Sequence, residues 1–433
     1  MSAVAPNRRQ LPLTGRCQVP SDKSISHRAA LLAACSSGTS RIENYSRAGD
    51  CRASTDLVRS LGCAVREAGD TLEVTGLGAD FPARVIGGAL DCARSGTTMR
   101  LGAGLVAGLP LTVQLTGHAQ LLRRPMERVA TPLRLMGAEV TTAAEGRPPL
   151  RVRGGGLAGI NFTPPQASAQ VKSALLLAGL RASSATTVCE PLATRDHTER
   201  LLAAMGARIE VLRKGTTGQT VRLEPGGLSP LHLTVPGDAS SAAVLAAAAA
   251  LVPRSDVRLE RVSVNPTRIG FFEVLRRMGG NVELEIADDN QGPEPVADIR
   301  VRHAPLRAFR IDSLEVPGLI DELPLLGLLA TTAEGVSEVR GAAELRLKES
   351  DRIAGLITGL RSLGAEAEQL DDGFLVHGPT PLRGGRCDAL TDHRLAMTFT
   401  LAGLVSREPV SVRGAEFISD SFPGFRQLLG GLA

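Results

Sequence analysis

Four lysines stand out in this chain of 433 residues, because the other 45 of its 49 basic residues are arginines. They are Lys23, Lys172, Lys214 and Lys348. Arginine is a planar cation that keeps its proton, whereas the pKa of a lysine can be lowered enough for proton transfer. Lys23 lies in PSDKSISHR and Lys348 in LKESDR, each among Ser, Asp, Glu and Arg. We therefore expect these two to act in catalysis or phosphate binding, and regard Lys214, in the turn-like RKGTTG, as a chance survivor.

The composition indicates a globular protein of two or three domains that binds small anions. Hydrophobic residues make up 43% of the chain, but aromatic residues only 3%, and the formal net charge is +4. A nucleic-acid-binding protein is expected to carry a basic stripe and stacking aromatic side chains. Arginine concentrated in short motifs suits small anionic ligands better, so we expect no nucleic-acid partner.

The seven cysteines form no CxxC pair and no Cys/His spacing typical of a metal site. We expect no metal, no structural disulfide and a reducing, cytoplasmic location. The N-terminus has no apolar signal core. The longest apolar run, 242–252, is too short to span a bilayer and predicts a buried helix instead.

A repeated unit of about 70 residues organises the chain. A helix-like stretch that ends in Leu or Met plus Gly, followed by a strand, recurs six times, as in LVRSLGCAV and PLRLMGAEV. Each glycine stands where a helix needs a left-handed stop residue. These glycines are Gly62, Gly137, Gly206, Gly279, Gly364 and Gly430.

A second helix recurs in each unit and is apolar nearly all round, which predicts burial on most sides. Its copies include SISHRAALLAA and ASSAAVLAAAAAL. Each unit therefore reads as βαβαββ, with a buried helix first and an amphipathic outer helix second. We predict an α/β fold (α+β in some schemes) of two pseudo-equivalent domains with three units each. The first domain comprises 1–19 and 233–433, so that the N-terminal strand completes the C-terminal half, and the second comprises 20–232.

Polar residues gather at the starts of the six buried helices. A helix N-terminus carries free N–H groups and a partial positive charge, and so attracts phosphate or carboxylate. Hydroxyl residues at these starts could be plain N-caps: Ser24, Thr97, Ser168 and Ser240. Charged or amide side chains occupy the same place in other copies, which favours a polyanion site: Arg28, Arg100, Gln170, Asp321, His393 and Arg394.

Taken in order along nearly the whole chain, the motifs resemble those of the 5-enolpyruvylshikimate-3-phosphate synthase family. They are PSDKSISHR, ARSGTTMR, RRPMERV, SAQVKSALL, TRDHTER, PGDASSA, IDELP, LKESDR, TDHRLAM and SFPGF. The resemblance implies an inside-out α/β barrel of six repeats whose two domains close over the substrates. It also implies transfer of the enolpyruvyl group of phosphoenolpyruvate to the 5-hydroxyl of shikimate 3-phosphate with release of phosphate. This is a step of the shikimate pathway to chorismate and the aromatic amino acids, and glyphosate is an inhibitor of it.

The resemblance also assigns roles to residues. Shikimate 3-phosphate is expected to contact Lys23, Ser24, Arg28, Ser168, Ala169, Gln170, Asp321 and Lys348. Phosphoenolpyruvate is expected to contact Lys23, Gly96, Arg124, Gln170, Arg352 and Arg394. Asp321 is the expected base near the 5-hydroxyl, with Lys23 and Glu349 as partners in proton transfer. Supporting roles fall to Asp50, Thr97, Arg100, Arg195 and His393.

The reaction needs these residue types. A hydroxyl must lose a proton and a methylene carbon must gain one before phosphate leaves, which carboxylates and lysine can serve. Arginine forks neutralise phosphate and carboxylate groups. We expect no cofactor, no partner beyond the two substrates, and a monomer.

Three positions depart from the usual family pattern: Arg94, Glu344 and Asp420. Two alternatives share the fold. A sister enzyme transfers enolpyruvate to a UDP-amino sugar, UDP-N-acetylglucosamine, but PSDKSISHR is the wrong first motif for it, and Cys92 is not followed by its reactive-cysteine loop. A non-catalytic anion-binding scaffold would be expected to lose Lys23, Asp321 or Glu349, and all three are present.

Overall fold

A computed structural model of the chain describes residues 11–78, 89–214, 218–287 and 292–433. The chain divides into two compact units. Unit 1 comprises Met1–Pro20, Pro236–Asn290 and Glu294–Ala433, and unit 2 comprises Ser21–Val235 and Gln291–Pro293. The side chain of Lys214 lies outside the described residues.

Unit 2 contains three four-stranded sheets. The first has the order β13-β2-β4-β3, from His232–Thr234, Ser37–Glu43, Thr71–Leu77 and Ala64–Ala68. The second has the order β5-β6-β8-β7, from Ala89–Asp91, Thr112–Thr116, Arg147–Arg153 and Glu139–Ala143. The third has the order β9-β10-β12-β11, from Asn161–Phe162, Thr186–Glu190, Gly218–Leu223 and Ile209–Lys214. In every sheet the first pair is parallel and the next two pairs are antiparallel.

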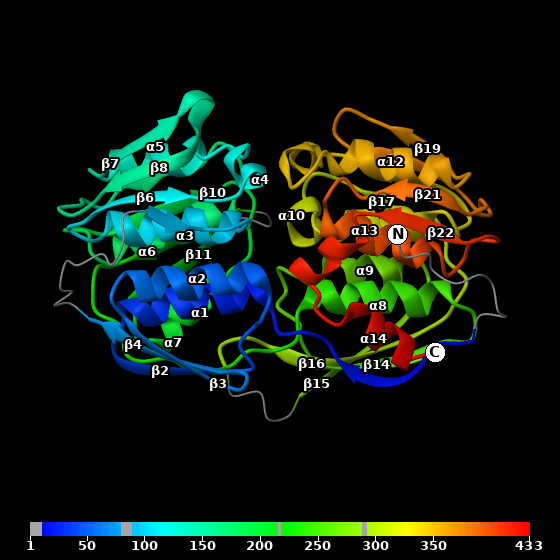
Figure 1. Ribbon diagram of the computed structural model, residues 1–433, viewed down its shortest axis with the longest axis horizontal. Coiled ribbons are helices and arrows are strands. Elements are labelled where there is room, and N and C mark those ends of the chain that lie inside the picture. The colour runs from blue at the N-terminus through cyan, green and yellow to red at the C-terminus, as the bar shows by residue number, and fades with distance from the viewer. Residues whose placement is uncertain (1–10, 79–88, 215–217, 288–291) are drawn as a thin grey trace. The chain divides into compact units, whose positions relative to one another are not determined.

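The helices of unit 2 fall into the two kinds that the repeat predicts. Nearly all residues are buried in α1 (Lys23–Cys35), α3 (Gly96–Ala107) and α6 (Ala169–Gly179). One face remains exposed in α2 (Gly49–Ser60), α5 (Glu127–Leu135) and α7 (His197–Ala204). Shorter turns are α4 (Ala119–Leu122) and η1 (Ala144–Gly146). Figure 1 shows α1 and α3 enclosed between the sheet of β2, β4 and β3 and that of β6, β8 and β7.

Unit 1 repeats this arrangement with one shortened copy. Its sheets have the orders β1-β14-β16-β15, β17-β18-β20-β19 and β21-β22. The strands are β1 Thr14–Gln18, β14 Asp256–Ser263, β16 Val296–Arg302, β15 Asn281–Ile286, β17 Arg310–Ile311, β18 Gly335–Val339, β20 Phe374–Gly378, β19 Glu366–Gln369, β21 Gly385–Asp388 and β22 Val410–Arg413. The helices are α8 Ala239–Leu251, α9 Gly270–Arg277, α10 Val316–Leu319, α11 Leu323–Ala330, α12 Arg352–Ser362, α13 His393–Ala402 and α14 Phe425–Gly431, with η2 Ala343–Leu347 and η3 Ala415–Asp420.

The N-terminal strand β1 belongs to a sheet of unit 1. It pairs in parallel with β14, from Thr14 beside Asp256 to Gln18 beside Glu260. The strand β13 has the corresponding place in unit 2, because it pairs in parallel with β2 from the far end of that unit. In each unit a distant strand thus closes the first sheet.

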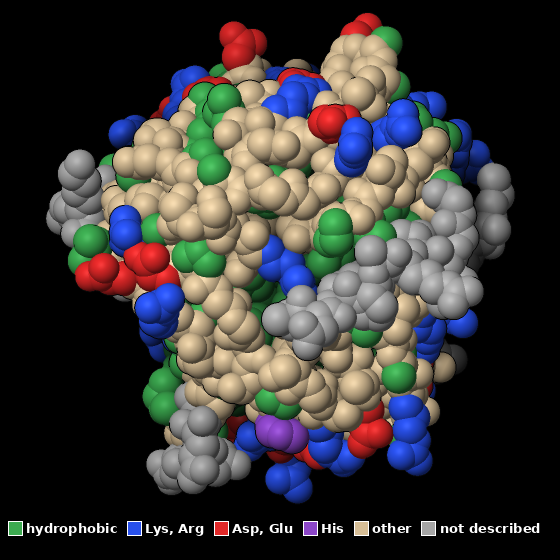
Figure 2. Space-filling view, turned by 90° about the vertical axis from the view of Figure 1, so that its left-hand side faces the viewer, with side chains coloured by type: hydrophobic (Ala, Val, Ile, Leu, Met, Phe, Trp, Pro, Cys, Tyr) green, Lys and Arg blue, Asp and Glu red, His purple; other side chains and the backbone are tan. Residues whose placement is uncertain are grey.

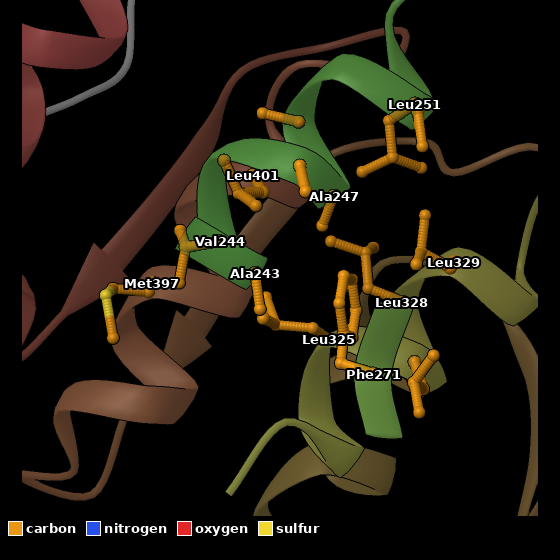
Figure 3. Packing of buried hydrophobic residues seen from close by; sticks show 14 of the residues in the cluster. Ala243, Val244, Ala247, Leu251, Phe271, Leu325, Leu328, Leu329, Met397 and Leu401 are labelled. Carbon is orange, nitrogen blue, oxygen red and sulfur yellow. The ribbon is translucent and has the colours of Figure 1, made fainter. Parts of the chain in front are cut away.

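The core of unit 1 is built on α8, whose thirteen residues are all buried. Figure 3 shows Ala243 and Ala247 of α8 facing Leu325 and Leu328 of α11, and Val244 on the other side of α8 near Met397. Alanine keeps the helix narrow, so that neighbouring helices can approach from several sides. The apolar run 242–252 is therefore a core helix, as predicted.

Five of the six repeat glycines end a helix in the left-handed region, as predicted. Their φ angles are 97° at Gly62, 106° at Gly137, 82° at Gly206, 92° at Gly279 and 93° at Gly364. The sixth prediction was wrong, because Gly430 lies inside α14. No strand follows that helix within the described residues, and Gly430 has helical backbone geometry there. Within the described residues, no helix is long and apolar enough to cross a membrane.

Close contact of α3 with α6 gives a test of the packing. A Cβ added at Gly104 would lie 2.1 Å from the backbone oxygen of Ala174, which cannot move without shifting α6. We expect Gly104→Ala to destabilise the protein by about 1–3 kcal/mol or more, the range for overpacking a core. Gly430→Ala, also within a helix but with nothing within 4 Å, is the control. Equal thermal unfolding midpoints for the two variants would contradict this packing.

Candidate active site

The buried helices begin at polar residues, but the N-caps are not all those expected. Asp22 accepts a hydrogen bond from Ile25 N at 2.9 Å, and Ser95 accepts one from Thr98 N at 3.0 Å. Asp238 caps α8 in the same way. Ser24, Thr97 and Ser240 therefore lie in the first turn rather than at the cap, whereas Ser168 is the N-cap of α6. The first-turn side chains are thus free to bond elsewhere.

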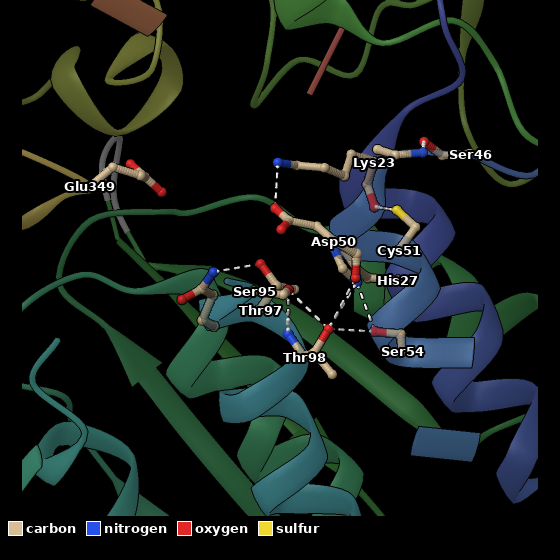
Figure 4. A network of polar contacts seen from close by, with 12 residues as sticks. Lys23, His27, Ser46, Asp50, Cys51, Ser54, Ser95, Thr97, Thr98 and Glu349 are labelled. Atoms are coloured by element: carbon tan, nitrogen blue, oxygen red, sulfur yellow. Dashed lines mark hydrogen bonds and ion pairs between the residues drawn. The ribbon is translucent and has the colours of Figure 1, made fainter. Parts of the chain in front are cut away.

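In unit 2, Lys23 is the first residue of α1 and pairs with a carboxylate from α2. Its Nζ atom lies 2.9 Å from Asp50 Oδ2, and both side chains are 19% exposed. Figure 4 shows the pair at the edge of a larger polar network. Asp50, predicted only as a supporting residue, thus orients the lysine of the first motif.

Arg28 lies one turn further along α1 and is buried. Its Nε donates to Thr198 Oγ1 at 2.8 Å, and its terminal nitrogens donate to Ser24 O at 2.9 Å and Ser173 Oγ at 3.0 Å. Thr198 and Ser173 also bond to each other at 2.6 Å. Sequence reasoning missed these two residues, although both lie inside quoted motifs, because nothing in their type indicated a contact with Arg28.

Gln170 and Thr97 connect α6 with α3. Gln170 Nε2 donates to Thr97 Oγ1 at 2.9 Å, and Arg100 donates to Gln170 Oε1 at 2.5 Å. The Arg124 guanidinium lies over Gly96, because a Cβ added there would be 2.7 Å from Arg124 NH1. Three of the residues predicted to contact phosphoenolpyruvate, Gly96, Arg124 and Gln170, are therefore neighbours in the fold, linked through Arg100.

His27 joins three helices behind this surface (Figure 4). Its Nδ1 lies 2.7 Å from Ser54 Oγ of α2, which in turn lies 2.8 Å from Thr98 Oγ1 of α3. Burial lowers the pKa of His27 to about 3, against an opposing effect of Asp50. The imidazole is therefore neutral at physiological pH, and the network needs no counter-ion for it.

In unit 1, Arg352 is the centre of a cluster of carboxylates. It is 2% exposed, at the start of α12. Its NH1 lies 3.2 Å from Asp321 Oδ1, its Nε lies 2.8 Å from Asp392 Oδ2, and its NH2 bonds Glu349. Burial opposes the charge, but Asp392, Glu349 and Asp321 outweigh it and raise the pKa of Arg352. The predicted base and the predicted proton-transfer partner are thus held by one cation.

Lys348 precedes this cluster. Burial lowers the pKa of its ammonium, while Asp321 and Glu344 act in the opposite direction. Glu344 Oε1 lies 3.9 Å from Lys348 Nζ, so this departure from the family pattern faces the lysine. A lysine with a lowered pKa can exchange a proton more readily at neutral pH.

Arg394 lies in the first turn of α13 beside His393, and Asp392 caps that helix through Arg394 N at 2.8 Å. Its NH1 lies 3.5 Å from Glu322 Oε1. Glu322 is 1% exposed and also accepts from Ser240. Asp392 and Glu322 are further residues that sequence reasoning missed, although each is adjacent to a predicted residue in its motif.

The remaining predicted residues lie near these groups in sequence. Ala169 is the first residue of α6, and Arg195 lies in the segment before α7. Arg94 directly precedes Ser95, the cap of α3, and Asp420 ends η3. No group of three or more His, Cys, Asp or Glu residues in the described part of the chain could hold a metal ion.

The chain is similar to proteins of one enzyme family over nearly its whole length. The family model described as EPSP synthase (3-phosphoshikimate 1-carboxyvinyltransferase) matches residues 8–429. A 3-phosphoshikimate 1-carboxyvinyltransferase of Halorhodospira halophila is 49% identical over 424 residues, which cover 96% of this chain and 93% of that protein. One of Pelotomaculum thermopropionicum is 48% identical and covers 96% of each chain.

Solved structures show the same relationship. The EPSP synthase of Acinetobacter baumannii superposes with a TM-score of 0.87 at 38% identity, over 100% of this chain and 98% of that one. The enolpyruvyl transferase NikO of Streptomyces tendae has a TM-score of 0.76 at 20% identity, over 97% and 95% of the two chains. The second likeness concerns the fold alone.

The fold and these matches together define an enolpyruvyl transferase built from repeated α/β units. More particularly, the chain belongs to the EPSP synthase family, that is, to the 3-phosphoshikimate 1-carboxyvinyltransferases. The predicted family, fold class and enzyme class are thereby confirmed, as is enolpyruvyl transfer in the shikimate pathway.

The buried His27 predicts a dependence of stability on pH. Its folded pKa of about 3 lies below the ordinary value of 6.5, so below pH 6.5 the unfolded chain binds a proton that the folded chain does not. This contribution therefore makes folding less stable by up to about 1.4 kcal/mol per pH unit as pH falls from 6.5 towards 3. His27→Gln should flatten unfolding free energy against pH in that range.

The control for loss of one imidazole is His232→Gln, at an exposed position of β13. Chemical unfolding at pH 7 and pH 5 compares the two variants with the wild type. A His27→Gln protein that loses as much stability as the wild type on acidification would show that His27 is not the buried neutral group described.

Proposed function

We propose specific roles for these residues in the transfer of the enolpyruvyl group from phosphoenolpyruvate to the 5-hydroxyl of shikimate 3-phosphate. Shikimate 3-phosphate is bound by Lys23, Ser24, Arg28, Ser168, Ala169, Gln170, Asp321 and Lys348. Phosphoenolpyruvate is bound by Lys23, Gly96, Arg124, Gln170, Arg352 and Arg394. Asp50, Thr97, Arg100, Arg195 and His393 support these contacts.

One observation carries the proposal more than any other. Asp321 and Glu349, the two carboxylates to which proton transfer is assigned, bond to the same buried guanidinium of Arg352. Arg352 itself is assigned to the anionic substrate. This shared cation supports the proposal, because a reaction of this kind needs its proton-transfer groups held close to the anionic substrate that Arg352 is proposed to bind.

The proposed steps follow from the roles assigned to these residues. Asp321 accepts the proton of the 5-hydroxyl as its oxygen attacks C2 of phosphoenolpyruvate, while the methylene carbon C3 gains a proton. Glu349 and Lys23 exchange the proton at C3, which is lost again when the C2–O bond to phosphate breaks. Arg124, Arg352 and Arg394 neutralise the carboxylate and phosphate charges throughout.

The surface agrees with small-molecule partners. On the face shown in Figure 2, basic and acidic side chains are interspersed and do not form one basic stripe. Nucleic-acid binding would be expected to need such a stripe. The expectations of a monomer and of a cytoplasmic location stay predictions.

The direct test of the reaction is phosphate release from phosphoenolpyruvate with shikimate 3-phosphate as acceptor. We expect turnover that depends on both substrates, with one phosphate formed per 5-enolpyruvylshikimate 3-phosphate. UDP-N-acetylglucosamine is the control acceptor. Phosphate release with the sugar nucleotide, and none with shikimate 3-phosphate, would overturn the proposal.

Asp321→Asn tests the assignment of the base. The amide keeps the shape of the side chain but cannot accept the hydroxyl proton, so turnover should fall by about 10²–10⁴. Calorimetric affinity for shikimate 3-phosphate should change far less than turnover. If turnover persists while that affinity weakens, Asp321 only positions the substrate.

Gly96→Ala tests the approach of Arg124. The new methyl group would lie 2.7 Å from Arg124 NH1 and 3.1 Å from Arg100 NH1, so both guanidinium groups must shift. We expect a higher KM for phosphoenolpyruvate with little change in that for shikimate 3-phosphate. Because glyphosate is longer than phosphoenolpyruvate, its inhibition should weaken more. Superimposable glyphosate inhibition curves for variant and wild type would refute the steric argument.

A further inference from the structure

Lys172 is the one lysine of the four whose role remains to be explained. It lies in α6, two residues after Gln170, and is fully buried with 0% exposure. Its Nζ lies 2.7 Å from Glu190 Oε2 and 2.6 Å from Glu199 Oε1, and donates to Thr194 O at 3.4 Å. An ammonium has three hydrogens to donate. All three are thus directed to acceptors of the segment that runs from the end of β10 into α7.

The two carboxylates around this ammonium have different surroundings. Glu190 also accepts from Gln219 Nε2 at 2.6 Å and from Thr194 Oγ1. Glu199 forms the ion pair with Lys172 given above. Burial raises the pKa of Glu199, while Lys172 acts in the opposite direction. Burial tends to lower the pKa of Lys172, but the combined effect of Glu199 and Glu190 is larger, so that the pKa is raised. The ammonium of Lys172 therefore keeps its proton and acts as a fixed positive charge rather than as an acid in proton transfer.

Each end of this cluster adjoins a residue that holds Arg28. Ser173, next to Lys172, accepts from Arg28 NH2 at 3.0 Å. Thr198, next to Glu199, accepts from Arg28 Nε at 2.8 Å. The ion pair of Lys172 with Glu199 thus fixes α6 and α7 at the two points from which they orient the Arg28 guanidinium.

The contact with Thr194 O extends the same constraint to the loop. Arg195, which follows Thr194, is among the residues with a proposed supporting role, and Ser168 and Gln170 begin the helix that carries Lys172. The end of β10, residues 191–196 and the first turn of α7 are thereby tied to one buried ammonium on α6.

We propose that Lys172 is a positioning residue for shikimate 3-phosphate. With Glu190 and Glu199 it fixes residues 191–196 and α7 against α6, so that Arg28 is held in the orientation that binds this substrate. The inference rests on the proposed assignment of Arg28 to that substrate. Lys172 itself does not touch the reacting atoms.

The arrangement of acceptors around Lys172 Nζ explains why a lysine occupies this position in an arginine-rich chain. Three acceptors converge on one atom, Lys172 Nζ, from Glu190, Glu199 and Thr194. A tetrahedral ammonium fits such convergence, whereas the planar guanidinium spreads its donors over a wider fork. Replacing the lysine changes the spacing of α6 and α7 rather than only their charge.

Two variants test the proposal. Lys172→Met removes the cation but leaves buried carboxylates unpaired, which by itself can prevent folding. The second variant, Lys172→Met with Glu190→Gln and Glu199→Gln, removes the charges together and keeps similar volumes. Val152→Ala in β8, a buried position of the same unit on a strand without predicted site residues, controls for general loss of core packing.

In the neutral triple variant we expect the KM for shikimate 3-phosphate to rise by about tenfold to a hundredfold, the effect of a misplacement of about 1 Å. The KM for phosphoenolpyruvate, measured at saturating shikimate 3-phosphate, should stay within about twofold, as should both constants in Val152→Ala. A shikimate 3-phosphate KM within about twofold of the wild type overturns the proposal. So does a triple variant that fails to fold, because Lys172 would then hold the whole unit and not one binding face.

Hydrogen–deuterium exchange separates this inference from the reaction itself. The triple variant should exchange faster than Val152→Ala in residues 191–196 and in the first turn of α7, whatever the substrate. If the wild type releases no phosphate from the two substrates, the proposed function fails while this exchange result still reports on the constraint. Exchange equal to that of Val152→Ala overturns the role of Lys172 even in an active enzyme.

Discussion

Compensation of buried cations by carboxylates is the interaction on which this structure depends. Removing an ion from water costs several kcal/mol, roughly, unless it is paired and hydrogen-bonded. Arg352 meets this condition through Asp321, Glu349 and Asp392, which come from the starts of α11, α12 and α13. Because the carboxylates belong to different elements, the ion pairs also fix those elements in position. In unit 1 the electrostatic requirement and the positioning of the proposed catalytic groups are therefore met by the same contacts.

The buried helices explain why such charges gather where they do. A helix enclosed on all sides cannot expose its first N–H groups to water, so it must begin at polar residues. Asp22, Ser95, Ser168, Asp238 and Asp392 supply the caps. Each cap leaves the next turn free for side chains such as Lys23, Gln170 and Arg394. Repeating the unit therefore repeats a place suited to anions, and the sequence of each first turn decides what chemistry is done there.

The sequence was informative where a residue's type fixes its conformation or its partner. Glycine after an amphipathic stretch predicted five left-handed helix ends, and failed only at Gly430, where no strand follows. The motifs identified the family and named Arg352 and Asp321, which the structure brings together. The register of contacts could not be predicted. Ser173 and Thr198 hold Arg28 because α6 and α7 converge on it, and a serine or threonine in a helix gives no sign of that in its sequence. The N-cap of α1 is Asp22, two residues before Ser24, the candidate considered from the sequence. The sequence could not decide between them, because both residue types are favourable N-caps.

The division of work between arginine and lysine follows from the geometry of their acceptors. Arg352 and Arg28 each bond three groups spread around a plane, which suits a rigid fork. Lys172 instead meets three acceptors that converge on one atom, and Lys348 lies where burial lowers the pKa of an ammonium. A guanidinium has no single donor atom for convergent acceptors, so it does not fit the place of the Lys172 ammonium. The shape of the acceptor set thus explains a lysine at position 172, and the lowered pKa of the Lys348 ammonium is a property that an arginine at that position would not have.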